Sequence, residues 1–463
     1  AQAILAPGLC PNRGMALAMP SSAASSARSF SSVPGTNVDE LAAVALGSAV
    51  ILLPLCGTLV LLFFSLSQVG AATSTVVVVL ALLLSVGYTP DIPAGESYAR
   101  LSSKGCSERW PVCGGAVAGG PPAAASPSAH VRRWCSCPAP GTGTEFFAEP
   151  RVTIVCLHGT FSSSHEFEAW AQELQGEAAA EGGSVEVIGV DLPGHGLTGP
   201  WEDAGCQPAY SVGADVGFLS CLLQRQELRG RQLVLVGHSI GGAIAAAYAA
   251  RFPGSVAGLV LVAPWGLRHG PQDGGRQHCT WFVKFVLSPR WRFLSLWLCL
   301  LMVRVTPLPL LRYALGTAFG PGAPQVGEPP PKAPLVSAAA EQLHVHMLRE
   351  GNRPTFVARI SHMVAEERHA LQSHARWRAE LEGVRCPVQL QWGEADTWLH
   401  ASRCLAWAEA LGDRAADVRL WPGVGHCVME QTPRRSAAAA WSFISGLGGL
   451  ASTGGPAPAH VGG

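Results

Sequence analysis

The chain has 463 residues, enough for one catalytic domain with additional segments. Its 32 basic and 32 acidic side chains cancel to a formal net charge of zero, which excludes a global electrostatic attraction to nucleic acid. Only 14% of the residues are charged and 48% are hydrophobic, a composition that indicates contact with a membrane.

The N-terminal residues 1–40 are predicted to form a tail or a targeting segment. Residues 15–38 are rich in Ala and Ser and contain no acidic residue. This composition is typical of a transit peptide, and a disordered tail would have the same composition. Both interpretations stay open.

Residues 41–87 are predicted to form a transmembrane hairpin. No charged residue occurs between Glu40 and Asp91, and a short uncharged connection joins the apolar runs Leu41–Leu66 and Ala71–Val86. A helix needs about 20 apolar residues to cross the bilayer core. The second run reaches that length only if the flanking residues, out to Val69 and Tyr88, are included. A single signal anchor followed by a buried helix is the alternative. Basic residues on both sides of a hairpin would place the catalytic domain on the cytosolic or stromal side.

Residues 88–130 are predicted to form a linker because this stretch is rich in Pro, Gly, Ala and Ser. A short strand is expected near Val131–Cys135. The four cysteines of residues 88–150 do not have the spacing of common zinc motifs: Cys106, Cys113, Cys135 and Cys137. We expect free thiols rather than disulfides, because the other cysteines are scattered in apolar runs as buried small residues are.

The remainder predicts an α/β domain whose core is 131–267 and 384–447, with 448–463 as a disordered tail. Short apolar runs alternate with helical stretches, which indicates a mostly parallel sheet with helices on both faces. The expected strands are Val152–Leu157, Val185–Val190, Leu233–Val236, Leu259–Val262, Val388–Trp392 and Val418–Leu420. In such a sheet, ligands bind beyond the carboxyl ends of the strands.

A G-x-S-x-G motif, Gly237–Gly241, follows one of these strands and precedes the helix-forming run Ala243–Arg251. Strand, sharp turn and helix are the context of a nucleophile elbow, which makes Ser239 the candidate nucleophile. The helix N-terminus would direct free N–H groups at the site, and the N–H of Ile240 is a candidate oxyanion donor.

A second candidate segment, His158–Phe161, follows the strand Val152–Leu157. The matching loop in elbow-containing folds donates a backbone N–H to the oxyanion hole. We assign that donor to Thr160, with Phe161 as the alternative. His158 and His238 are expected to be structural rather than catalytic.

The candidate acid and base follow the last two expected strands. Glu394 and Asp396 lie in the loop after one strand, and His426 lies on a Gly-flanked loop after the next. An imidazole with a pKa near neutrality suits proton transfer from a serine hydroxyl. The order of serine, acid and histidine along the chain is the one that this type of site requires.

These motifs together resemble the α/β-hydrolase superfamily. The stretches that carry the resemblance are Leu157–Gly159, Asp191–Gly196, Gly237–Gly242, Trp392–Asp396 and Gly425–His426, with Glu430 and Pro433 behind it. The resemblance implies an α/β-hydrolase fold and favours Asp396 over Glu394 as the acid that orients His426. Ser239 argues against epoxide hydrolases and haloalkane dehalogenases, which have a similar layout and an Asp nucleophile.

Within the superfamily, the chain resembles membrane-anchored monoacylglycerol-lipase-like hydrolases. The similar features are the N-terminal anchor, Ala263–Leu267 ahead of the cap, and Gly425–Glu430. Some relatives carry a His-x4-Asp pattern associated with acyltransferases. That pattern is absent here because Gln431 occupies the Asp position.

Residues 268–383 interrupt the alternation and are predicted to form an inserted helical cap. Trp281–Leu315 combines apolar, aromatic and basic residues, which is typical of a helix at a membrane interface. An ordinary cap helix packed on the core is the alternative. Ser337–Glu380 is predicted to form polar helices. Its histidines are expected to be solvated rather than metal-binding: His344, His346, His362, His369 and His374.

We therefore expect a membrane-anchored serine hydrolase that cleaves lipid esters, such as monoacylglycerols or lysolipids, through an acyl-enzyme intermediate. Its expected partners are the lipid ester and the bilayer, with no nucleic acid, cofactor or metal. An acyltransferase and a hydrolase of prenyl esters are alternatives. A non-catalytic ligand-binding protein of the same fold is an alternative of another class. The sequence leaves the organelle and the oligomeric state open.

Overall fold

A computed structural model describes residues 91–101, 106–112, 128–135, 152–160, 162–200, 210–225, 228, 231–268, 308–321, 332–368 and 370–447. The predicted transmembrane hairpin (41–87) and both predicted tails lie outside these residues. Within the described ranges, no helix combines the length and apolarity that crossing a bilayer requires.

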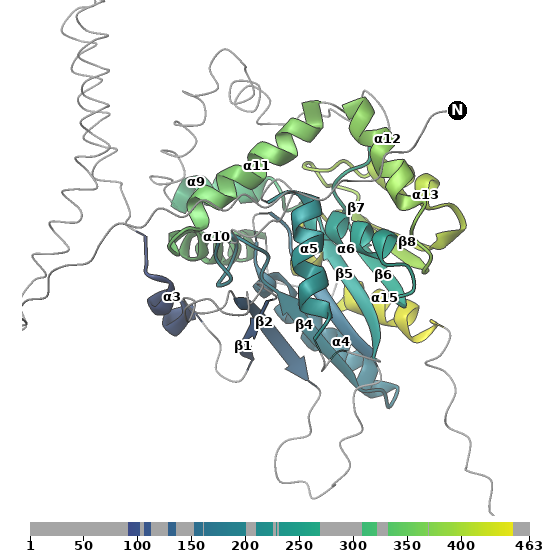
Figure 1. Cartoon of the computed structure of the whole chain (residues 1–463), viewed down its shortest axis with the longest axis horizontal. Coiled ribbons are helices and arrows are strands. Elements are labelled where there is room, and N and C mark those ends of the chain that lie inside the picture. Colours follow the sequence, from purple (N-terminus) through teal and green to yellow (C-terminus); the bar gives the residue numbers. More distant parts are fainter. Residues whose placement is uncertain are drawn as a thin grey trace, which may run out of the picture. The chain divides into compact units, whose positions relative to one another are not determined.

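The described part of the chain is built around one eight-stranded sheet with the order β1-β2-β4-β3-β5-β6-β7-β8 (Figure 1). The strands are β1 (Ser107–Pro111), β2 (Ser128–Cys135), β3 (Val152–Leu157), β4 (Val185–Val190), β5 (Gln232–His238), β6 (Gly258–Val262), β7 (Val388–Gly393) and β8 (Ala415–Trp421). The pairings of β1 with β2 and of β2 with β4 are antiparallel, and all others are parallel. The predicted mostly parallel sheet is confirmed.

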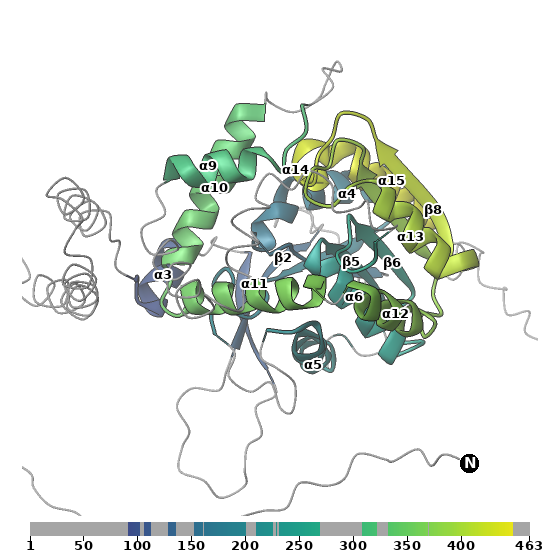
Figure 2. The ribbon, with the colours of Figure 1, turned by 90° about the horizontal axis from the view of Figure 1, so that it is seen from above.

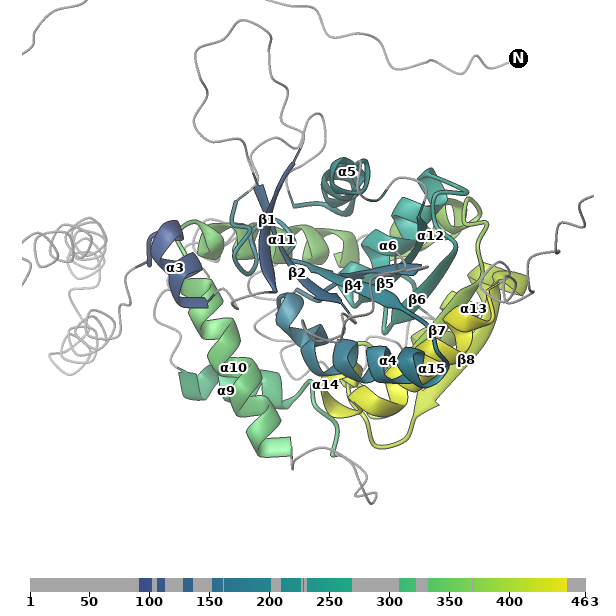
Figure 3. The ribbon, with the colours of Figure 1, turned by 90° about the horizontal axis from the view of Figure 1, so that it is seen from below.

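Helices cover both faces of this sheet (Figure 3). The helices α5 (Val212–Leu223), α6 (Ile240–Arg251) and α12 (Ala370–Leu381) lie on one face, and α4 (Glu168–Ala180) and α15 (Pro433–Ser445) lie on the other. Strand β3 is buried throughout, because its alternating side chains serve two separate cores. Val155 and Leu157 join the core beneath α5 and α6, whereas Ile154 and Cys156 join the core beneath α4 and α15.

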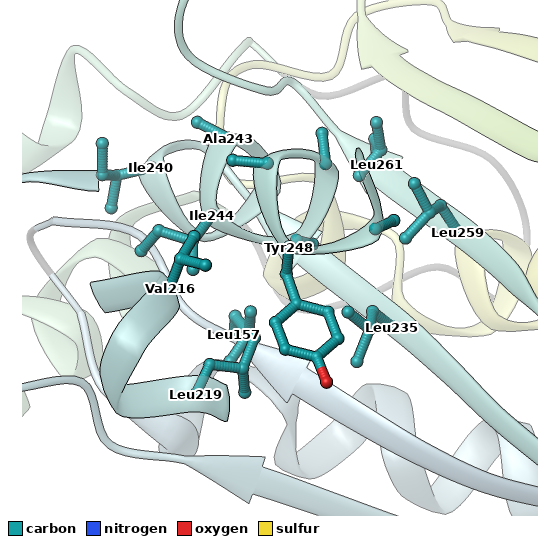
Figure 4. Packing of buried hydrophobic residues seen from close by; sticks show 14 of the residues in the cluster. Leu157, Val216, Leu219, Leu235, Ile240, Ala243, Ile244, Tyr248, Leu259 and Leu261 are labelled. Atoms are coloured by element: carbon teal, nitrogen blue, oxygen red, sulfur yellow. The ribbon is translucent and has the colours of Figure 1, made fainter. Parts of the chain in front are cut away.

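Helix α6, which comes directly after β5, is buried along nearly its whole length. Its many alanines and glycines let it lie close to the strands, and Ile244 and Tyr248 fill the space between α6 and α5 (Figure 4). Full burial of a side chain such as Ile244 stabilises the fold by about 1.5–3 kcal/mol. The first turn of α6 is thereby fixed relative to the carboxyl end of β5.

Regular structure also occurs in residues 88–130, the segment that the composition predicts to be a linker. Helix α3 (Ala94–Leu101) and strand β1 fall within it, and β1 extends the sheet beyond β2. The Ile92 N–H donates to the Leu348 carbonyl, with an N···O distance of 2.6 Å. Asp91 forms an ion pair with Arg353 at 3.4 Å. This segment is therefore attached to the helices that come after β6.

Those helices form the insertion between β6 and β7 (Figure 2). They are α9 (Leu308–Gly316), α10 (Lys332–Leu348), α11 (Asn352–Arg368) and α12. Arg359 of α11 forms a buried bidentate ion pair with Asp215 of α5 and donates to the Pro193 carbonyl at 3.2 Å. Removing one partner of such a buried ion pair costs about 3–5 kcal/mol. The ion pair therefore fixes α11 over the sheet.

The structure corrects one expectation about the histidines of these helices. His346 is buried rather than solvated, and burial lowers the pKa of its imidazole to about 4. His344, His362 and His374 are partly exposed, and His369 lies outside the described residues. Among the described residues, no three His, Cys, Asp or Glu side chains are arranged so that they could hold a metal ion. The periodicity of a polar helix could not identify His346, because its burial depends on packing against His165 of another element.

Residues 281–307, most of the segment predicted to lie at a membrane interface, are outside the described residues. Helix α9 covers the end of that segment, and its Tyr313 is 74% exposed. On its other side, α9 packs against α10 through Leu311, Leu315 and Val336. The interfacial interpretation therefore stays a prediction.

Candidate active site

Ser239 occupies a strained turn between β5 and α6. Its backbone has φ 53° and ψ −118°, a conformation that non-glycine residues rarely adopt. Neighbouring backbone groups hold it there: the Ser239 N–H donates to the Val262 carbonyl, and the Ser239 carbonyl accepts from the Trp265 N–H, each at 2.9 Å. The predicted elbow thus has the strand, turn and helix that the motif requires.

The two glycines of the motif are required by close backbone approach. A Cβ atom on Gly237 would collide with the carbonyl group of Gly241, and a Cβ on Gly241 would collide with the carbonyl group of Leu157. A side chain on Gly237 would force the end of β5 away from the start of α6, and a side chain on Gly241 would push the turn away from β3. The flanking glycines therefore let Ser239 sit directly beside the loop that comes after β3.

We expect Gly241→Ala to lower the free energy of unfolding by about 3 kcal/mol, because the new methyl group overlaps backbone atoms that cannot rotate away. Gly217→Ala is the matched control: Gly217 lies in α5, is exposed, and has open space at its Cβ position. The control should raise stability by about 0.5–1 kcal/mol, the usual gain for Gly→Ala within a helix. Urea denaturation of both variants measures the difference. A Gly241→Ala protein as stable as the wild type would refute the close packing of the elbow.

Asp396 and His426 form a buried hydrogen-bonded pair. His426 Nδ1 lies 2.7 Å from Asp396 Oδ2, and the two residues are 3% (His426) and 2% (Asp396) exposed. The other carboxylate oxygen of Asp396 accepts from the backbone N–H groups of Trp398 and Leu399, each at 2.8 Å. With Nδ1 hydrogen-bonded to the carboxylate, the neutral imidazole carries its lone pair on Nε2.

The two carboxylates that the sequence offers for this position differ sharply in location. Glu394 is exposed, whereas Asp396 points inward to His426. Both come after β7, but the Ala395 N–H donates to the Val424 carbonyl at 2.9 Å, which ties the loop of the acid to the loop of His426. The structure therefore brings Asp396, and not Glu394, to the imidazole.

The loop of His426 is also fixed from two other sides. The His426 N–H donates to the Ala318 carbonyl at 2.6 Å, and the Trp398 ring lies 5.6 Å from the imidazole, centroid to centroid. The imidazole of His238, the residue before Ser239, lies 4.7 Å away by the same measure. The candidate base and the elbow are therefore neighbours, although Ser239 and His426 are far apart in the chain.

The candidate oxyanion loop lies against the elbow. A Cβ on Gly159 would be 3.4 Å from the Cβ of Ser239, and the next residue, Thr160, is buried. The Thr160 hydroxyl contacts Met363 Sδ of α11 at 3.2 Å. Ile240 is the first residue of α6, where a backbone N–H has no partner within the helix. Phe161, the alternative donor, lies outside the described residues.

The motif Asp191–Gly196, which carries part of the resemblance to the family, also has a structural role: its side chains hold the loop of Thr160. His195 Nε2 lies 2.8 Å from the Thr160 carbonyl oxygen. Asp191 accepts from the backbone N–H groups of Ser164 and Leu197, each at 2.8 Å. Burial alone would raise the pKa of Asp191, but the adjacent His130 imidazole lowers it well below its usual range. Asp191 therefore acts as a buried anion that organises this loop.

The side chain of His158 forms hydrogen bonds to backbone groups on both sides of its ring. Its Nδ1 lies 2.7 Å from the Gly159 carbonyl oxygen, and its Nε2 accepts from the Leu192 N–H at 3.0 Å. Burial lowers the pKa of His158, so the neutral imidazole satisfies both contacts. These contacts support the structural role expected for this histidine.

The sequence model described as the alpha/beta hydrolase family matches residues 154–439. A monoacylglycerol lipase of Xenopus laevis is 24% identical over 303 residues, which cover 64% of this chain and 76% of the relative. A (lyso)-N-acylphosphatidylethanolamine lipase of Bos taurus is 33% identical over 118 residues, 25% of this chain and 30% of the relative.

Among solved structures, a thermophilic esterase from Thermogutta terrifontis overlaps this chain with a TM-score of 0.45 and 17% identity. The overlap covers 73% of this chain and 98% of the esterase.

Proposed function

The chain belongs to the α/β-hydrolase family, and on that premise we propose that it is a serine hydrolase that cleaves carboxylic esters of lipids. The observation that carries the proposal is the buried Asp396–His426 hydrogen bond of 2.7 Å beside a serine in an elbow conformation. An acid, an imidazole and a positioned hydroxyl are the three groups that acyl transfer through a covalent intermediate needs.

In the proposed reaction, Ser239 Oγ attacks the ester carbonyl carbon while His426 Nε2 takes the hydroxyl proton. Asp396 holds the imidazole through Nδ1 and stabilises the imidazolium that forms. The N–H groups of Thr160 and Ile240 bind the negative oxygen of the tetrahedral intermediate, a contribution of about 3–4 kcal/mol for each donor.

The intermediate then collapses. The ester C–O bond breaks, the alcohol leaves with the proton from His426, and the acyl group stays on Ser239. Water attacks this acyl-enzyme with His426 as base, and the acid leaves with the hydroxyl of Ser239 restored.

Lipid esters with one acyl chain are the proposed substrates. The named activity of one relative, on monoacylglycerol, supports this choice. The named activity of the other, on (lyso)-N-acylphosphatidylethanolamine, supports a lipid ester as substrate. The predicted hairpin at 41–87 and the apolar segment at 281–307 would keep the enzyme at the bilayer surface, where such esters dissolve. We propose a membrane-anchored enzyme with its catalytic domain on the cytosolic or stromal side.

Acyl transfer to an acceptor other than water is less well supported by the residues around His426. The Asp of the acyltransferase-associated pattern would stand at position 431, where the side-chain oxygen of Gln431 accepts from the N–H groups of Gly425 and Gly320 at 2.7 and 3.0 Å. Gln431 is thus occupied in holding the loop of the base. We therefore propose hydrolysis.

Lipid profiling of membranes incubated with the wild type or with Ser239→Ala tests the substrate class. We expect the wild type to deplete long-chain monoacylglycerols or lysolipids and to release fatty acid, and the variant to leave the lipids unchanged. Full activity on short water-soluble esters without any change among the lipids would refute the proposed substrate. Depletion of prenyl esters alone would identify the other ester class instead.

A further inference from the structure

A second buried acid–imidazole pair lies beside the proposed catalytic residues. His238 Nδ1 lies 3.2 and 3.3 Å from the two carboxylate oxygens of Glu166, and the His238 and Glu166 side chains are 6% and 2% exposed. Glu166 comes from the short helix η1 (Ser164–Phe167), which lies just after the loop of Thr160 in the chain. His238 ends β5, immediately before Ser239.

Each member of this pair also holds one of the two loops that carry the chemistry. Glu166 accepts from the Gly159 N–H at 3.3 Å, next to the proposed oxyanion donor Thr160. His238 Nε2 lies 3.0 Å from the backbone carbonyl oxygen of His426. A continuous path of hydrogen bonds therefore runs from the oxyanion loop through Glu166 and His238 to the loop of the base.

The contacts of His238 define its protonation. Nε2 faces a carbonyl oxygen and Nδ1 faces a carboxylate, and only an imidazolium donates from both nitrogens at once. Burial by itself would lower the pKa of His238, but the Glu166 carboxylate, together with Glu430 and the backbone carbonyl of His426, raises the pKa above its usual value. The pair is thus a carboxylate and an imidazolium, with no net charge.

Other titratable groups face the pair from two regions. Cys156 of β3 and His158 after it are both influenced by the Glu166 carboxylate, and burial raises the pKa of the Cys156 thiol and lowers that of the His158 imidazole. The remaining groups are the His426 imidazole and the side chains of α14 (Val428–Gln431) and the loop before it. Glu430 lies near Glu166, and burial together with that carboxylate raises the pKa of Glu430 to about 7. The Cys427 thiol contacts Glu430, and burial raises its pKa well above the usual value, so the thiol stays neutral. When Glu430 ionises near neutrality, it adds to the negative potential that keeps His238 protonated.

We propose that Glu166 and His238 act as a positioning pair, which holds the oxyanion loop and the loop of His426 in a fixed relation to Ser239. The inference rests on the proposed function and adds two residues to it. Neither residue reacts with the substrate; each acts through the loop that it holds. A displacement of about 1 Å at a reacting group can cost about 10²-fold in rate, which is the scale on which such positioning acts.

Glu166→Gln tests the charge of the pair with little change of shape. We expect kcat to fall about 10- to 100-fold while KM changes less than about twofold, because the substrate still binds but base and oxyanion donors lose their alignment. Glu166→Asp keeps the charge and should recover part of the loss. Glu186→Gln is the matched control: Glu186 is equally buried on β4, pairs with Arg231, and should leave kcat unchanged.

The pH profile separates positioning from a general loss of structure. Because the pKa of His238 is raised, the ion pair is intact below that pKa and is lost as the pH rises through it. The kcat of the wild type should therefore decline on the alkaline side. Glu166→Gln removes the largest of the contributions that raise the pKa of His238, so the deprotonation of His238 and the decline in kcat should move to lower pH. A Glu166→Gln protein with wild-type kcat, or with an unmoved alkaline limb, would overturn the proposal.

A measurement on the wild type covers the case in which the variant does not fold. Nitrogen NMR of the histidine-labelled protein should show one buried imidazole protonated on both nitrogens at neutral pH, at a position beside a carboxylate. Absence of any such imidazolium would overturn the proposal. Labelling of Ser239 by a fluorophosphonate distinguishes a failure of the positioning proposal from a failure of the proposed function. If the wild type is labelled and Glu166→Gln keeps its kcat, only the positioning pair is refuted; an unlabelled Ser239 refutes the proposed function itself.

Discussion

Replacing Ser239 by alanine is expected to lower kcat for ester hydrolysis by about 10⁶-fold, to a rate near that of the oxyanion site alone. Alanine lacks the oxygen that attacks the ester carbonyl. Hydrolysis of a chromogenic monoacyl ester by the purified variant measures the effect.

Alanine also fits the turn, because Ser239 is held by its backbone contacts with Val262 and Trp265 rather than by its hydroxyl. The variant should therefore unfold at the same urea concentration as the wild type. A folded Ser239→Ala protein that retains more than a few per cent of the activity would show that another residue is the nucleophile.

The second large effect is expected for Asp396→Asn, which should lower kcat by up to about 10⁴-fold, as loss of the orienting carboxylate does in comparable triads. An amide opposite Nδ1 favours the wrong tautomer of His426 and cannot stabilise the imidazolium. The two backbone N–H groups that face Asp396 Oδ1, those of Trp398 and Leu399, keep an oxygen acceptor in the asparagine, so the loop should keep its fold.

Glu394→Gln is the matched control, because Glu394 lies in the same loop as Asp396 and is exposed. We expect its kcat to stay within about twofold of the wild type, since exposed charges contribute little. Steady-state kinetics of both variants measure the difference. A crippled Glu394→Gln next to a nearly normal Asp396→Asn would reverse the two roles.

The central sheet was predictable from the sequence because its strands are short runs of apolar residues, and each expected run lies within an observed strand. The elbow was also predictable, because Gly237 and Gly241 occupy the two positions of the motif where a Cβ atom would collide with backbone atoms. Strand, turn and helix each depend on local pattern, and local pattern is visible in the sequence.

The choice between Glu394 and Asp396 could not be made from local pattern. Both residues lie in one loop and both carry a carboxylate, so only the direction of each side chain shows which one can reach the imidazole. In the structure, the Ala395 N–H bonds to the Val424 carbonyl, which turns Asp396 toward His426 and leaves Glu394 in solvent. The resemblance to the family, not the residues themselves, favoured Asp396.

Contacts between distant segments were missed for a related reason. Glu166 and His238 are 72 positions apart, and nothing in either local sequence indicates that they form a pair. Strand β1 lies in a region rich in Pro and Gly, where edge pairing with β2 outweighs the weak local preference for extended structure. Both features are set by tertiary packing.

Mapping the adduct of a fluorophosphonate probe by mass spectrometry tests the proposed nucleophile most directly. We expect a single adduct on the peptide that contains Ser239 in the wild type, none at that position in Ser239→Ala, and much slower labelling in His426→Ala, because the serine hydroxyl then has no base. An adduct at another residue of the wild type, or labelling of Ser239→Ala at the wild-type rate, would contradict the assignment of Ser239 as the nucleophile.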